Sequence, residues 1–182
     1  PPENKVPFAD SAFKKIVLSR TENSPMGRTV AVAALVMAES DVRRLDGMPR
    51  RQEIVERWNL RLQLRVLPVA GELQKLAVYV QPYIKSAQAQ GPVSPVLVDV
   101  IRVDLAQVST GTTTIDLPAV ESTKLRARAG RNAWQEWGKE FYGVVMSVFD
   151  ATPTLLYQGV SVRGLLSEAS AEPPSNPLHA QP

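Results

Sequence analysis

The chain has 182 residues, enough for one domain with a substantial core and too few for two of ordinary size. The apolar fraction of 44% is ordinary for a globular protein, and a net charge of +3 is too small to identify a partner. The absence of cysteine excludes disulfides, thiolate nucleophiles and cysteine-ligated metals. The longest apolar run, residues 29–38, is about half of the roughly 20 residues that a membrane-spanning helix needs. The first residue is Pro1 rather than Met, so we allow for a signal peptide or anchor upstream, and the compartment is not indicated.

The N-terminal third is expected to be mainly helical. Residues 1–9 contain three prolines and are predicted to form an extended arm. Short helices are predicted over residues 11–19 and 49–58, the second because Pro49 suits the first turn of a helix. Residues 29–39 fit a strand or a helix, since valines alternate among alanine, leucine and methionine, and we favour the helix.

The middle of the chain changes to a period of two. Residues 60–66 alternate leucine or valine with arginine and glutamine, the pattern of a half-solvated strand. Residues 73–81 fit the returning strand of a hairpin. Residues 96–105 give the clearest strand, which is apolar on both faces in its first half and is therefore expected near the middle of a sheet. Residues 113–117 fit a short strand, and residues 155–166 fit a strand, a turn and a second strand.

Residues 132–149 form the most distinctive stretch of the sequence. At about 100° per residue, one arc of a helical wheel collects the aromatic and aliphatic residues Trp134, Trp137, Phe141, Val144, Val145 and Val148. Asn132 and Gln135 have the spacing of a capping box, which satisfies free N–H groups at a helix start. We therefore predict a long amphipathic aromatic helix over this range that packs on the protein's own sheet, with a partner-binding ridge as the alternative.

The expected fold class is α+β, a mostly antiparallel sheet covered by helices, with extended Pro-rich termini. The expected organisation is the arm at residues 1–9, a single globular domain at residues 10–166 and a Pro-rich tail at residues 167–182. The tail is rich in alanine, serine, glutamate and proline, and it cannot bury enough apolar surface to offset its ordering entropy. We expect it to be disordered or held by a partner.

No stretch has the pattern of a catalytic or cofactor-binding site. The single histidine, His179, lies in the Pro-rich tail without the fixed partners that acid–base catalysis or zinc binding requires. Residues 159–164 lack the spacing of a nucleophile elbow, and no phosphate-binding glycine loop occurs. Asp99 and Asp104 would lie on opposite faces of one strand, and we expect a structural arginine partner for Asp99. The sequence therefore predicts no enzymatic activity, no cofactor and no metal.

Two groups of basic residues are candidates for binding. The arginines between residues 43 and 65 are mixed with acids, whereas the group at residues 124–131 contains none. Positive charge ahead of a helix opposes the helix dipole and would seek an anion, which could be a phosphate, an acidic partner or a nearby carboxylate such as Glu121; a solvated basic face is the simplest interpretation. No aromatic residue is interleaved with the second group, which argues against a stacking platform for single strands. The candidate anion- or nucleic-acid-binding residues are Lys124, Arg126, Arg128, Arg131, Arg50 and Arg51.

The sequence favours a non-enzymatic structural or assembly subunit of a larger multiprotein complex or particle. Its partners would be protein subunits of a homo- or hetero-oligomer, which it would contact through its extended termini. The alternative is a nucleic-acid-binding protein that uses the basic clusters at residues 124–131 and 43–65, and it predicts an affinity that falls steeply with salt. An enzyme that uses only carboxylates and arginines is a third class, for which no site can be assembled.

Overall fold

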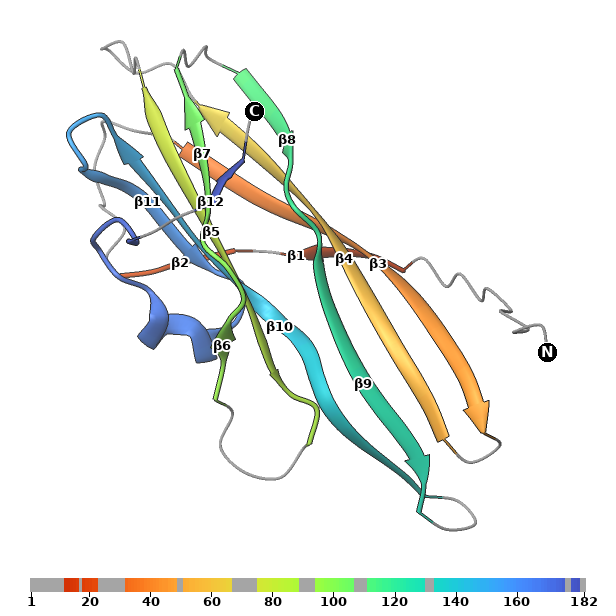
Figure 1. The fold of residues 1–182 in the computed structure, drawn as a ribbon. Coiled ribbons are helices and arrows are strands. Elements are labelled where there is room, and N and C mark those ends of the chain that lie inside the picture. The colour runs from red at the N-terminus through yellow and green to blue at the C-terminus, as the bar shows by residue number, and fades with distance from the viewer. Residues whose placement is uncertain are drawn as a thin grey trace.

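The fold, taken from a computed structural model, is built mainly of antiparallel strands that curl into a half-barrel (Figure 1). Within the described residues the one helical element is a short 3-10 helix, η1 (Arg163–Glu168). The structure describes residues 12–16, 18–22, 32–48, 51–66, 75–88, 94–106, 111–129, 133–175 and 178–180.

The described part of the chain forms twelve strands, several of which are unusually long. β3 and β10 each have 17 residues and β4 has 16, against about five or six in an average strand. The strands are β1 (Ala12–Ile16), β2 (Ser19–Arg20), β3 (Val32–Met48), β4 (Arg51–Val66), β5 (Leu76–Ser86), β6 (Val96–Leu97), β7 (Ile101–Leu105), β8 (Gly111–Asp116), β9 (Val120–Arg128), β10 (Trp134–Asp150), β11 (Leu155–Val160) and β12 (Leu178–Ala180).

The main path through the sheet runs β1-β3-β4-β9-β10-β5-β7-β12, so its two edges come from the two ends of the described chain. β8 and β9 follow one another along the same side of β4, and β11 lies on β10 with β2 beyond it. β12 pairs in parallel with β7, whereas the other pairings between described strands are antiparallel.

Strand β10 changes partners at Gly138 and thereby joins the two halves of the sheet. Its first residues, up to Gly138, pair with β9, and from Lys139 onward it pairs with β5. Gly138 has a φ of +108°, and a Cβ there would lie 2.6 Å from the carbonyl oxygen of Thr123. Only glycine fits this bend, because a side chain would meet the backbone of the neighbouring strand.

The main core lies on one face of the curled sheet, which we call the inner face. Alternate residues of the central strands point there and are almost completely buried, as expected for a pleated sheet. They include Leu60, Leu62, Leu64, Val78, Val80, Ile101, Val103, Val144, Met146 and Val148. At the opposite face the aromatic ring of Tyr79 meets that of Phe149 edge to face at 5.6 Å, and η1 buries Leu165 against Tyr83.

The predicted α+β class is wrong, and so is the helix predicted over residues 132–149. Most of that range is β10, and Asn132, the predicted cap, lies outside the described residues. From Gly143 to Phe149 the strand is buried on both faces, because one set of side chains enters the main core and the other packs in the smaller clusters of the opposite face, which include Leu165 of η1. A strand that is apolar on both faces gives a continuous apolar run, and such a run also fits a helical wheel.

The three N-terminal helices are also wrong. Residues 11–19, 29–39 and 49–58 contribute to β1, β3 and β4 instead. The apolar pair Ile54 and Trp58 illustrates the cause. A spacing of four places two residues on the same side of a helix, and because four is even it also places them on the same face of a strand.

The strands predicted from a period of two are mostly confirmed. Residues 60–66 are the second half of β4, residues 73–81 overlap β5, and residues 113–117 overlap β8. The predicted hairpin is wrong, since β4 pairs with β3, β8 and β9, and β5 pairs with β6, β7 and β10. The prediction of one strand near the middle of the sheet at residues 96–105 is wrong, since this range forms two strands, β6 and β7, close to the edge of the sheet. In residues 155–166 the first predicted strand is confirmed as β11, and the second is wrong because the chain enters η1 there.

Candidate functional site

The predicted basic cluster is divided between the two faces of the sheet. Lys124, Arg126 and Arg128 occupy alternate positions of β9 and therefore share a face. Arg126 lies opposite Gln52 in β4, whereas Arg51 lies opposite Ala127 and so belongs to the other face. Arg50 and Arg131 lie outside the described residues.

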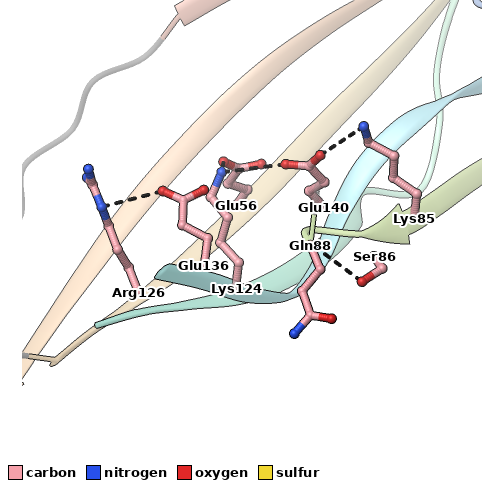
Figure 2. Close-up of polar contacts among 8 residues, drawn as sticks. All are labelled: Glu56, Lys85, Ser86, Gln88, Lys124, Arg126, Glu136 and Glu140. Carbon is pink, nitrogen blue, oxygen red and sulfur yellow. Dashed lines mark hydrogen bonds and ion pairs between the residues drawn. The ribbon is translucent and has the colours of Figure 1, made fainter. Parts of the chain in front are cut away.

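A chain of ion pairs is centred on Lys124 (Figure 2). The Lys124 Nζ lies 3.0 Å from Glu56 Oε1 of β4 and 3.9 Å from Glu140 Oε2 of β10. The other carboxylate oxygen of Glu140 lies 3.1 Å from the Nζ of Lys85 in β5. The Lys124 and Glu56 side chains are only 17% and 15% exposed, so their attraction is less screened than that of a surface pair.

Arg126 is neutralised by a second carboxylate. Its Nε lies 3.4 Å from Glu136 Oε1 of β10 (Figure 2), and its guanidinium lies 4.6 Å from the ring centroid of Trp134. Both contacts are favourable for a cation, the second through the negative face of the indole ring. Together with the chain around Lys124, the group contains three cations and three carboxylates, so its formal charge is zero.

The bend of β10 explains why these side chains meet. Glu136 precedes Gly138 and lies on the part of β10 that pairs with β9, whereas Glu140 follows it and lies on the part that pairs with β5. Glu140 therefore connects Lys124 on one half of the sheet with Lys85 on the other. We call the six residues Glu56, Lys85, Lys124, Arg126, Glu136 and Glu140 the seam network.

The seam network adjoins the aromatic end of the main core. Trp58, two residues after Glu56 on the same strand face, stacks on Phe141 with ring centroids 4.7 Å apart. Phe141 packs against the aliphatic core, so aliphatic, aromatic and charged side chains follow one another along β4 and β10. This order suits a structural role, in which the ion pairs lie at the border between the core and the solvent.

The outer-face arginines also have partners. The Arg51 guanidinium lies 5.9 Å from the ring centroid of Trp137, Arg57 lies 3.9 Å from Glu121, and Arg61 lies 2.6 Å from Asp116. The carboxylate suggested for the basic cluster, Glu121, thus pairs with β4. The carboxylates that meet Lys124 and Arg126 were not identified from the sequence, because they lie on other strands.

The candidate catalytic residues do not come together. Asp99 Oδ1 accepts a hydrogen bond of 2.7 Å from the backbone N–H of Val100, and Asp104 pairs with Arg102 at 2.9 Å. His179 lies in β12, opposite Arg102. In the part of the chain that the structure describes, no three histidine, aspartate or glutamate side chains are close enough to hold a metal ion.

A buried amide, Gln158 of β11, joins segments from both ends of the chain. Its Nε2 donates to Ser147 Oγ at 3.0 Å and to the carbonyl oxygen of Ser170 at 2.6 Å. Its Oε1 accepts a hydrogen bond of 2.8 Å from the hydroxyl of Thr21. A fully buried amide needs such partners, and a glutamine among the apolar residues of 155–160 was the available sequence signal.

Two buried tyrosines have shifted acidities. Burial and the nearby carboxylate of Glu168 raise the pKa of Tyr83 above its ordinary value. Burial also raises the pKa of Tyr157, an effect that the Arg20 guanidinium opposes. Both hydroxyls therefore stay protonated near neutral pH, which suits packing and hydrogen bonding.

Neither protein-family models, nor curated proteins, nor solved structures gave a match to this chain. Among the helices in the described ranges, none has the length and apolarity needed to span a membrane. The function proposed below therefore rests on the arrangement of the strands and the side chains.

Proposed function

We propose that the protein is a non-enzymatic assembly subunit that contacts neighbouring subunits of a larger complex through the segments at its two ends. The observation that carries the proposal is the place of β1 and β12, which form opposite edges of the sheet. Extended segments bind sheets by adding a strand to an edge, where backbone groups are available for hydrogen bonds.

Both terminal strands cover their edges only in part. β1 pairs with residues 36–40 of the 17-residue strand β3. β12 pairs with residues 101–103 of β7. No other described strand pairs with the rest of these two edges, which supports contacts with further extended segments.

Nucleic-acid binding has less support as a function. Lys124 and Arg126 lie within 4 Å of glutamate oxygens, so a phosphate would have to displace carboxylates from partly buried pairs. Counterion release, the main source of nucleic-acid affinity, requires cations that are free to meet phosphates.

Light scattering of purified chain, with and without nuclease, tests the proposal. We expect an oligomer whose mass resists nuclease and falls when residues 1–16 or 176–182 are removed. A matched control replaces residues 176–182 by a flexible segment of equal length. It shows whether the oligomer depends on the sequence of the tail or only on its length. A full-length chain that stays monomeric over its accessible concentrations, or truncations that keep the full mass, would refute it. A mass that depends on nuclease would favour the alternative.

A further inference from the structure

The edge formed by β6 and β7 is longer than the strand that covers it. β6 and β7 pair with the same side of β5, since β10 occupies the other side along the whole strand. β12 covers residues 101–103 of this edge. No strand in the described ranges pairs with the outer side of β6.

The uncovered part of this edge is apolar. Val96, Leu97 and Val98 are 49%, 41% and 42% exposed, and they are consecutive in the sequence. Single exposed apolar residues are common on protein surfaces, but a run of three at an open sheet edge favours pairing with another extended segment.

The parallel direction of β12 shows which residues would continue the ladder. Leu178 pairs with Ile101, an offset of 77 positions. The same offset would place Pro173, Pro174 and Ser175 opposite residues 96, 97 and 98. Proline has no N–H to donate and is therefore compatible with an edge position, while its ring can cover an apolar neighbour.

The tail does not reach this position within one chain. The carbonyl of Ser170 is held by Gln158 on β11, and residues 173–175 form no strand. A tail that arrives from another molecule is held at its Ser170 by its own Gln158, so its path to the edge does not start from β11 of the receiving chain. It could occupy the same register over the whole edge, which is the geometry of an exchanged terminal strand.

We propose that the β6–β7 edge receives the C-terminal segment of a second copy of this chain. Leu178–Ala180 takes the register that β12 has here, and residues 173–175 cover residues 96–98. Three parallel pairs are a weak contact by themselves, and the longer contact between copies adds the burial of three apolar side chains. The inference rests on the proposed assembly role and names the contact that it uses.

Engineered cysteines test the exchange, because the chain has none of its own. Arg102 and His179 lie opposite each other in the β7–β12 register. The variants Arg102→Cys and His179→Cys, carrying different tags, are co-expressed and treated with a short bismaleimide. A cross-linked pair bearing both tags is expected. Thr112→Cys, at an exposed position of β8 on the other half of the sheet, replaces Arg102→Cys as the control and should give no such product.

A substitution at the edge provides a second readout. Leu97→Lys should raise the dissociation constant of the oligomer by at least about tenfold, because it places a charge in the contact. Leu166→Lys is the matched control, since Leu166 on η1 is 48% exposed and lies outside the contact; it should leave the constant unchanged.

The outcomes separate the two proposals. A monomeric chain refutes the assembly role and the exchange together. An oligomer without the two-tag product, or one that tolerates Leu97→Lys as well as Leu166→Lys, refutes the exchange and leaves assembly through another contact.

Discussion

Lys124 is the residue on which the seam network depends, because one ammonium group lies between two carboxylates from different strands. Glu56 and Glu140 are 15% and 28% exposed, so neither is fully hydrated. Loss of the cation would leave the partly buried Glu56 carboxylate without its ion-pair partner and Glu140 with Lys85 alone, and an unpaired, partly buried charge usually costs more than the ion pair itself contributes.

Lys124→Met is therefore expected to lower the free energy of unfolding by about 1–3 kcal/mol, less than for a fully buried pair because the site is partly exposed. Arg57→Met is the matched control. It breaks the pair with Glu121, whose side chains are 50% and 62% exposed, and it should cost under about 1 kcal/mol. Urea denaturation at neutral pH compares the two variants, and equal losses would show that the seam network contributes no more than a surface pair.

The stability that Asp150 gives to the turn between β10 and β11 depends on pH. Burial raises its pKa, but hydrogen bonds from Thr154 and Thr152 outweigh this and leave the pKa below its ordinary value. A lowered pKa in the folded state stabilises the fold above the pKa of the unfolded chain, roughly 3.9, and this stabilisation is lost as pH falls through the folded-state pKa.

Asp150→Asn should consequently destabilise the protein near pH 7 by up to about 1 kcal/mol, since solvent screens this exposed turn. The difference between the variant and the original chain should shrink below about pH 4, where the aspartate becomes protonated. Unfolding curves at several pH values measure it. A difference that stays constant between pH 7 and pH 3 would assign the effect to packing.

At the level of elements, the bend of β10 holds the two halves of the sheet together. Gly138→Ala should lower the free energy of unfolding by roughly 2–4 kcal/mol, because it combines an unfavourable φ with a clash against the Thr123 carbonyl. Gly111→Ala is the control, since Gly111 also has a positive φ, +135°, but no atom lies within 4 Å of the place that its new methyl group would take. Thermal unfolding of both variants tests the bend, and similar losses would mean that the contact with β9 is unimportant.

Strands with one solvated face could be predicted from the sequence, and the long strands buried on both faces could not. In residues 60–66 leucine alternates with arginine or glutamine, and this leaves no helical alternative. In β10 both faces are buried between Gly143 and Phe149, and every residue there except Ser147 is apolar or glycine, so the period of two disappears. Over β10 as a whole, the many valine, phenylalanine and tryptophan residues favour a strand and outweigh the helical arc.

The candidate site was predicted in part. Lys124 and Arg126 were identified by their charge, but their partners depend on strand pairing across the sheet. Glu56 reaches Lys124 because β4 pairs with β9, and Glu140 reaches it because β10 bends at Gly138. Neither pairing has a local signal in the sequence, so the cluster was interpreted as a solvated basic face or as a site for an anion, with Glu121 as the carboxylate suggested within the chain.

For the whole molecule, the zero net charge of the seam network predicts that its cations contribute little to the affinity for nucleic acid. Lys124→Gln and Arg126→Gln should change the affinity for double-stranded DNA by less than about twofold at 50 mM salt. Fluorescence anisotropy at 50 and 200 mM salt measures this. A large loss of affinity in either variant, together with a steep salt dependence of the original chain, would favour nucleic-acid binding instead.

Among the strands that the structure describes, β1 and β12 form the two ends of the main path, and each pairs with only part of its neighbour. Such edges favour association with extended segments unless they are protected. This connects the arrangement of the strands with the proposed assembly role, in which the short segments that cover the edges within one chain cover the edges of a neighbour.

The most direct test adds a synthetic peptide of residues 173–182 in excess to the assembled full-length chain and follows the mass by sedimentation velocity. The peptide should compete for the β6–β7 edge and lower the mass, whereas a peptide of scrambled order should leave it unchanged. An assembly whose mass is the same with either peptide would contradict the claim that its C-terminal segment joins neighbouring subunits.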